Sequence, residues 1–348
     1  MYFKSILIGF FIIISRTSGF VSIKTMQKST NLQTYINPWN DLSGITQYNH
    51  FVQIRSTIQK KTSGLVKIIR TENILPTFLL SISSGFIMKP KLSVLIKSMP
   101  FIVAVVITML IMSNSMIIND IFDMEIDKIN TPTRPLITGE LTKQEAIGIS
   151  IGLTLISELL SLRYLNASSQ PIVHIANIVI ILYTPIFKRI LFIKNLTCAG
   201  LISISTIFPA LCIENINGNF GLLMVLARMI LFGSMSVEML YDIKDTDGDL
   251  QNGINTIPIK YGKPFTYRLI CKILTFSILT NMIVLSSLYN YIYGIIFFIL
   301  QSPMLTRLND VKNTVFGKKT IKKYGLKTTE TLATTLIFLC FLARQYQA

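Results

Sequence analysis

Long apolar runs recur along this chain at lengths that match the thickness of a lipid bilayer. A helix needs about 20 predominantly apolar residues to cross the hydrocarbon core. The runs, several of them near the lower length limit, occupy residues 74–88, 98–118, 146–162, 171–187, 197–213, 220–241, 267–287, 290–304 and 329–343. The chain is only 14% charged, whereas soluble domains average about 25%. The sequence therefore predicts an all-α integral membrane protein with about nine transmembrane helices.

The first 65 residues differ in composition from the rest of the chain. Residues 1–19 have a lysine near the start, a short apolar core and small residues at the end, which is the layout of a signal peptide. Residues 20–65 contain a single acid, Asp41, and are typical of a transit peptide or a disordered linker. The two segments together resemble the bipartite leader of secondary plastids. A plastid membrane of an alga with a secondary plastid is therefore the predicted location, and the mitochondrial inner or ER membrane is the alternative. For the leader itself, the alternative is a signal anchor followed by a cytosolic linker.

Two acidic segments with the same spacing follow the second and the sixth apolar runs. They read "NDIFDMEID" from Asn119 and "YDIKDTDGD" from Tyr241. Their carboxylates stand in matching order at Asp120, Asp123, Glu125 and Asp127 and at Asp242, Asp245, Asp247 and Asp249. A charge at bilayer depth costs about 2.5–3.5 kcal/mol, so such residues normally face a wet cavity and mark function.

Basic residues are predicted on the same membrane face as both acidic segments. Because four predicted crossings separate the segments, they lie on one side of the bilayer. The loop between the fourth and fifth runs adds Lys188, Arg189 and Lys194 to that side. The positive-inside rule makes it the cytoplasmic, matrix or stromal face. The net charge of +16 thus suits membrane lipid or a phosphorylated substrate, and nucleic acid is not an expected partner.

The acidic segments predict a metal site if each continues the helix before it. Positions 120, 123 and 127 then share one stripe, as do 242, 245 and 249, whereas Glu125 and Asp247 point elsewhere. Carboxylates so close together stay ionised only beside cations. An all-oxygen site favours Mg²⁺, with Mn²⁺ as the alternative, and substrate phosphates complete its shell. The predicted metal ligands are Asp120, Asp123, Asp127, Asp242, Asp245 and Asp249. Alternatively, both segments are solvated loops outside the bilayer.

These segments resemble the signatures of the UbiA-type intramembrane prenyltransferases. The first motif is followed by "RPLITGELT", and the second lies in "DIKDTDGDLQNGINTIPIKYG". The resemblance covers residues 66–345 and implies a central cavity among nine helices, with both motifs in a cap on one face. It implies Mg²⁺-dependent transfer of a geranylgeranyl- or phytyl-like group from an allylic prenyl diphosphate to a lipophilic acceptor.

The resemblance also implies roles for individual residues. The expected catalytic residues are Asp120, Asp123, Asp127, Asp245 and Asp249, and the expected diphosphate ligands are Asn119, Lys128, Arg134 and Lys188. Two of the lysines have another interpretation. Lys188 could be a positive-inside anchor, as we expect for Lys194, and Lys128 could pair with a carboxylate one turn back.

The loop "DKINTPTRPLITGE" bears on the acceptor. It resembles chlorophyll synthases and geranylgeranyl ether-lipid synthases, which alkylate an alcohol. Enzymes acting on hydroxybenzoate usually have an arginine where this chain has Asn130, and homogentisate-type enzymes often lack the arginine that Arg134 supplies. An alcohol is therefore the expected acceptor, and an aromatic quinone or tocopherol precursor is the alternative. A cation-coupled transporter is a further alternative, but transporters hold such sites near the bilayer midplane.

Overall fold

The computed structural model describes residues 42–213, 218–251 and 253–346. The chain divides into two compact units, Met1–Val66 and Lys67–Ala348. In the first unit the structure shows helix α2 (Leu42–Ile68), where the sequence predicted a transit-like or disordered segment. The signal-like prediction for residues 1–19 and the transit-like prediction for residues 20–41 lie outside the described residues.

Each predicted apolar run corresponds to one helix of the second unit. In chain order these helices are α3 (Ile74–Met88), α5 (Met99–Phe122), α7 (Lys143–Tyr164), α8 (Gln170–Tyr183), α9 (Ile193–Leu211), α10 (Phe220–Gln251), α12 (Lys263–Leu288), α13 (Tyr291–Asn313) and α14 (Lys318–Gln345). Over the described part of the chain, 7 helices are long and apolar enough to cross a membrane. Helices α3 and α8, with 15 and 14 residues, are shorter. A count of nine spans therefore stays a prediction.

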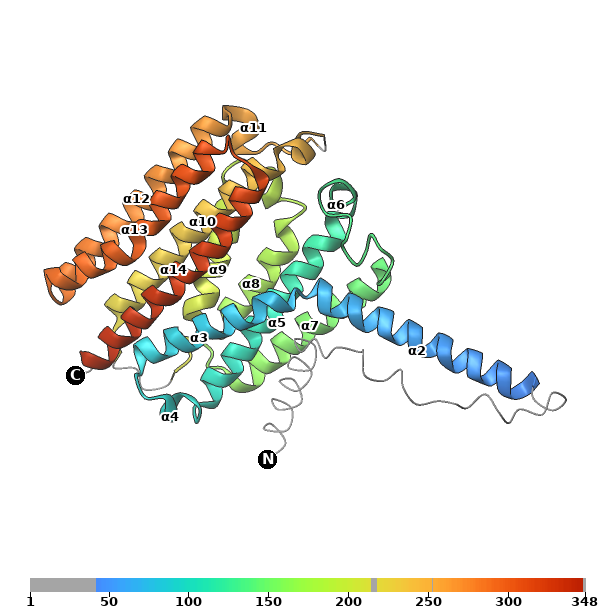
Figure 1. Cartoon of the computed structure of the whole chain (residues 1–348). Helices are drawn as coiled ribbons and strands as arrows, with labels where there is room; N and C mark the ends of the chain where they lie inside the picture. The colour runs from blue at the N-terminus through green and yellow to red at the C-terminus, as the bar shows by residue number, and fades with distance from the viewer. Residues whose placement is uncertain (1–41, 214–217, 252, 347–348) are drawn as a thin grey trace, which may run out of the picture. The chain divides into compact units, whose positions relative to one another are not determined.

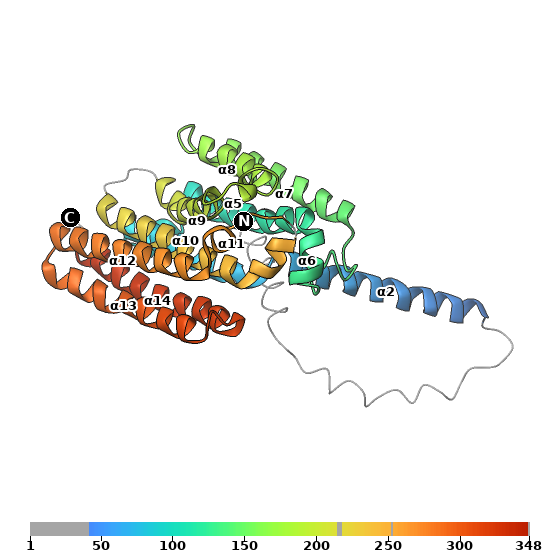
Figure 2. The ribbon, with the colours of Figure 1, turned by 90° about the horizontal axis from the view of Figure 1, so that it is seen from above.

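The helices of the second unit form a closed bundle. Consecutive helices pack on one another, and α14 returns to contact α3 (Figure 1). Seen from above, α9 and α10 lie between the group α12–α14 and the pair α7 and α8 (Figure 2). Small residues allow the closest approaches, because a Cβ on Gly85 would overlap the Phe101 ring and one on Gly294 would overlap Ser286. Close packing at small residues is the usual basis of helix association in membranes.

One end of the bundle carries both acidic motifs. The 3-10 turn η3 (Phe187–Arg189) follows α8 and brings Lys188 to Asp123 of the first motif. At the start of α14, Lys318 pairs with Asp247 of the second motif. These contacts confirm that the two motifs and the basic loops lie at the same end. At the other end the rings of Tyr289, Tyr293 and Tyr346 contact one another in edge-on and tilted arrangements. Aromatic residues are enriched at membrane interfaces.

The two motifs differ in their local structure. The second continues α10 without interruption, as the sequence predicted. The first does not continue α5, which ends at Phe122, and a separate short helix α6 (Met124–Asn130) follows. Pro132 lies two residues after α6, where a proline cannot extend a helix. The loop beyond it ends at Thr142, whose side chain and that of Glu145 form a capping box that starts α7.

Candidate active site

Asp123 forms the junction between α5 and α6. Its backbone lies at φ −91° and ψ 12°, in the sparsely populated bridge region where many active-site residues are found. The junction keeps its hydrogen bonds, because the Asp123 N–H donates to the Asn119 carbonyl at 2.9 Å and its own carbonyl accepts from the Asp127 N–H at 2.8 Å. The chain therefore changes direction within the motif and presents its carboxylates from two short helical segments.

Two arginines hold the first aspartate of this motif. Asp120 is 1% exposed. Its Oδ1 accepts a hydrogen bond from Arg70 Nη2 at 3.0 Å and lies 3.4 Å from Arg134 Nη1. Arg134 also lies 4.0 Å from Asp127, measured from Nε to Oδ2. The sequence analysis predicted Arg134 but missed Arg70, which lies some fifty positions before its partner. Arg70 has a left-handed backbone with φ 50°, a conformation that costs an ordinary residue about 1–2 kcal/mol.

The other two aspartates of the first motif, Asp123 and Asp127, are buried and paired. Lys188 Nζ donates to Asp123 Oδ2. Thr131 Oγ1 donates to Asp127 Oδ1 at 2.5 Å. Burial raises the pKa of Asp127 above its ordinary value, and the Thr131 hydrogen bond and the Arg134 charge partly offset that shift. The motif therefore requires nearby positive charge to stay ionised.

The most buried ion pair of the second motif joins Asp242 to Lys194. Other roles were predicted for both residues. Asp242 is 4% exposed, and its Oδ1 accepts from Lys194 Nζ at 2.5 Å while its Oδ2 accepts from Asn195 Nδ2 at 2.8 Å. We expected Lys194 to be a membrane anchor, but it is buried inside the bundle. Asp242, expected as a metal ligand, has both oxygens engaged in these bonds. These contacts show that Asp242 holds the buried Lys194 side chain in place.

Two further aspartates of the second motif, Asp249 and Asp245, differ in their exposure. Asp249 is 6% exposed. Asp245 has a partly exposed side chain, 33% accessible, and pairs with its neighbour Lys244 at 3.1 Å.

Direct packing joins the motifs. Helix α6 contacts α10, and a Cβ added to Gly248 would overlap the side-chain amide of Asn130. A glycine at this position therefore allows the end of α6 to rest against α10. No local sequence pattern predicts this contact, because the two residues lie on different segments of the chain.

Three charged residues of these segments point away from the site. Lys128 Nζ lies 2.7 Å from Glu125, and both side chains are more than half exposed. This is the pairing considered as an alternative, so the structure does not bring Lys128 to the cluster as a diphosphate ligand. Glu125 and Asp247 are directed outward, as predicted, and Asp247 binds Lys318 at 3.3 Å. The last expected diphosphate ligand, Asn119, is half-buried at the end of α5.

The donor set of the first motif fits a hard cation. Within the described ranges, no three carboxylate, histidine or cysteine groups stand close enough to hold an ion. However, Asp120 Oδ2 and Asp127 Oδ2 are buried and lack a hydrogen-bond partner. Buried polar atoms are normally paired, and carboxylate oxygens are the ligands that Mg²⁺ prefers. These two oxygens are therefore the atoms best suited to a metal ion.

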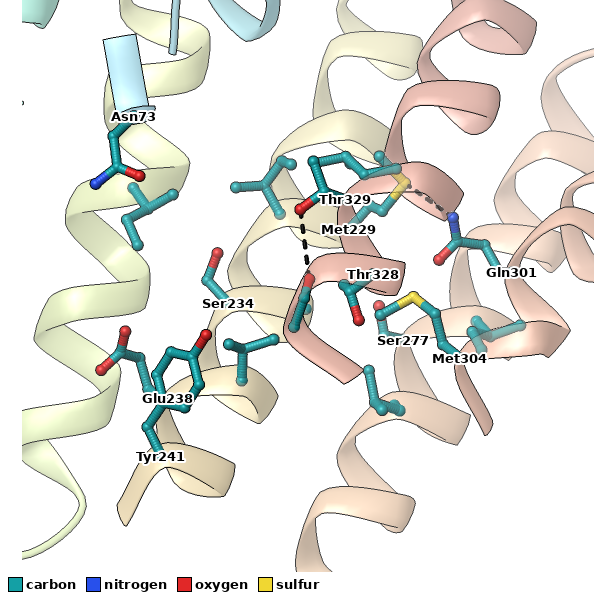
Figure 3. A pocket seen from close by; sticks show the side chains of 18 residues that line it. Asn73, Met229, Ser234, Glu238, Tyr241, Ser277, Gln301, Met304, Thr328 and Thr329 are labelled. Atoms are coloured by element: carbon teal, nitrogen blue, oxygen red, sulfur yellow. Dashed lines mark hydrogen bonds between the residues drawn. The ribbon is translucent and has the colours of Figure 1, made fainter. Parts of the chain in front are cut away.

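A cavity of about 320 Å³ lies inside the bundle next to the second motif (Figure 3). Helices α9, α10, α12, α13 and α14 line it, together with Asn73. Its wall is mostly apolar, with a few polar groups that include Glu238, Tyr241 and Gln301. Because Tyr241 directly precedes Asp242, the cavity reaches the level of the acidic motif. A mostly apolar pocket of this size with a few polar groups is typical of a site for a small lipophilic molecule.

Comparison with known proteins identifies the family. The UbiA prenyltransferase family profile matches residues 78–321. The chain belongs to this family. It is therefore an integral membrane prenyltransferase, which confirms the predicted enzyme class and the all-α membrane fold and removes the transporter alternative.

Relatives of this prenyltransferase include archaeal enzymes. The digeranylgeranylglyceryl phosphate synthase of Sulfurisphaera tokodaii is 28% identical over 75% of this chain and 94% of its own length. That of Methanosphaera stadtmanae is 29% identical over 60% of this chain and 77% of its own. A solved UbiA homolog from Archaeoglobus fulgidus, bound to GPP and Mg²⁺, superposes with a TM-score of 0.61 at 16% identity, over 80% of this chain and 99% of that one.

Proposed function

We propose that this chain transfers a geranylgeranyl-like group from its diphosphate to an alcohol of a lipid precursor, with Mg²⁺ required. The observation that carries the proposal is the meeting of the two acidic motifs, where Asn130 packs on Gly248 and α6 contacts α10, beside a largely apolar cavity. The charged end suits a diphosphate, and the cavity suits a lipophilic chain.

The carboxylates bind the diphosphate through a metal ion, and the basic groups bind it directly. Asp120, Asp123, Asp127, Asp245 and Asp249 are the proposed metal-binding and catalytic residues. Bound Mg²⁺ supplies Lewis-acid neutralisation of the charge that develops on the leaving diphosphate. Arg134 can hold phosphate oxygens with two parallel hydrogen bonds, and Lys188 contributes a point charge. Both basic groups already lie against the carboxylates. The UbiA homolog bound to GPP and Mg²⁺ supports this assignment.

The names of the relatives support an alcohol as the acceptor. Both archaeal relatives are digeranylgeranylglyceryl phosphate synthases, so we propose a glyceryl phosphate lipid that already carries one prenyl chain. The alternatives are an aromatic acceptor, as in quinone and tocopherol synthesis, and a phytyl donor. A plastid membrane remains the proposed location.

An acceptor screen tests the proposal. Membranes containing the protein receive radiolabelled geranylgeranyl diphosphate and one of three acceptors, namely a prenylated glyceryl phosphate, 4-hydroxybenzoate or homogentisate. We expect labelled ether lipid with Mg²⁺ and none after chelation, and parallel reactions with Mn²⁺ test the alternative metal. Label on an aromatic ring would contradict the alcohol acceptor. Transfer that persists in excess chelator would contradict the metal requirement.

A further inference from the structure

One carboxylate inside the bundle belongs to neither acidic motif. Glu238 lies on α10, four residues before Asp242 and seven before Asp245, so it shares their stripe of the helix. At a rise of 1.5 Å per residue it lies about 6 Å and 10 Å deeper in the bundle than these two residues. The sequence analysis missed it, because a single glutamate in an apolar run shows no spacing pattern.

Glu238 faces the cavity. It is among the residues that line this space, and Figure 3 shows it near Tyr241 and Ser234 of the same helix. Its hydrogen bond is to the Cys198 thiol of α9, a weak and uncharged donor. By contrast, Asp120, Asp123 and Asp242 each contact an arginine or a lysine. A carboxylate that lies within a membrane-spanning helix and faces a cavity usually marks a functional site.

We propose that Glu238 accepts the proton of the acceptor hydroxyl during prenyl transfer. This inference rests on the proposed function, in that the acceptor must be an alcohol. The hydroxyl oxygen forms a bond to the first carbon of the prenyl group. The bond from that carbon to the diphosphate oxygen breaks, and its electron pair leaves with the diphosphate. The hydroxyl proton passes to the Glu238 carboxylate and is later released to water.

The position of Glu238 fits this role. In the proposed function the motifs hold the diphosphate. The first carbon of the prenyl group then lies deeper in the bundle than the motifs, where the cavity begins. The nearest motif carboxylate, Asp242, has both oxygens engaged by Lys194 and Asn195 and is not available as a base. Glu238 is therefore the carboxylate best placed to meet an acceptor inside the cavity.

The test compares Glu238→Gln with a matched control in the Mg²⁺-loaded enzyme. Glu158→Gln makes the same change at a glutamate that binds His174 and Asn177 on the α7–α8 side of the bundle. General-base catalysis contributes about 10²–10⁴-fold. We therefore expect Glu238→Gln to lower kcat for the alcohol at least about a hundredfold, with the affinity for an unreactive prenyl thiolodiphosphate unchanged. The control should retain both properties.

A thiol analogue of the acceptor separates proton transfer from positioning. A thiol ionises more readily than an alcohol, so Glu238→Gln should lose much less activity with the thiol. Equal losses with both acceptors, or loss of thiolodiphosphate binding, would overturn the inference. Glu238→Asp keeps the carboxyl group and should have intermediate activity with a near-normal ratio of alcohol to thiol rates; a ratio shifted as strongly as in Glu238→Gln would also overturn it.

The same experiment separates this inference from the proposed function. If the unmodified enzyme prenylates the alcohol and Glu238→Gln does so equally well, the inference fails and the proposed function stands. If the unmodified enzyme prenylates only a ring carbon, both fail.

Discussion

The two acidic motifs share one spacing but are held in different ways. The second lies on one continuous helix, α10. The first is divided at Asp123 between α5 and α6, and its carboxylates are held by Arg70, Arg134 and Lys188 from three other segments. The second motif therefore keeps one helical register, with Asp242 held from α9 by Lys194, whereas the first is divided between two helices and is held from three other segments.

This difference predicts where binding can change the structure. The ion pairs of the first motif can exchange partners, because a diphosphate offers Arg134 and Lys188 the same charge that Asp120 and Asp123 do. In the second motif the Lys194–Asp242 pair is enclosed, with side chains 11% and 5% exposed. We infer that this pair is structural, while the pairs of the first motif rearrange when the metal and the substrate bind.

The largest expected effect is on activity, and it tests whether both motifs act in catalysis. Asp123→Asn and Asp245→Asn should each lower transfer by about a thousandfold, the scale seen when a group that stabilises developing charge is lost. Only Asp123→Asn should also lower thermal stability in detergent, because it leaves the Lys188 ammonium, 14% exposed, without its carboxylate. Substantial transfer by Asp245→Asn would remove the second motif from the site.

The next effect concerns stability and tests the structural role of the enclosed pair. Lys194→Met should destabilise the protein by about 3 kcal/mol, since it leaves a buried carboxylate unpaired. Adding Asp242→Leu should restore most of the loss, because a buried ion pair can be replaced by apolar groups of similar size. Chemical unfolding in detergent measures both variants, and Lys188→Met is the matched lysine variant at the first motif. A double variant no more stable than Lys194→Met would refute the assignment.

The sequence predicted the elements of this protein better than the contacts between them. Apolar runs and matched aspartates are local patterns, so the helices, the shared face and the outward direction of Glu125 and Asp247 followed from them. The break at Asp123 did not, because no proline or glycine marks it. Arg70, Lys194 and Glu238 were missed or misassigned because their partners lie on other segments or face an internal cavity.

A smaller effect tests the contact that joins the motifs. Gly248→Ala adds a methyl group where the Asn130 amide lies, and overpacking of this kind costs about 1–3 kcal/mol. We expect up to about tenfold lower transfer, because the Asn130 side chain must turn away from the new methyl group and the packing of α6 on α10 loosens. Asn130→Ala creates space at the same point, so the double variant should recover activity relative to Gly248→Ala. An active Gly248→Ala enzyme would show that the contact is not needed to bring the motifs together.

The smallest effect is expected at the exposed lysines. It tests whether a lysine that lies next to a motif necessarily takes part in the site. Lys128 follows the first motif in the sequence, and Lys318 lies beside the second motif in the structure. Their ion pairs with Glu125 and Asp247 are nevertheless exposed. Exposed pairs contribute about 0–1 kcal/mol. Lys128→Ala and Lys318→Ala should therefore keep both stability and the KM for prenyl diphosphate close to those of the unmodified enzyme, whereas Lys188→Met should raise that KM. If Lys128→Ala instead raised the KM as much as Lys188→Met does, the lysine would turn toward the diphosphate on binding, and α6 would have to rotate with it.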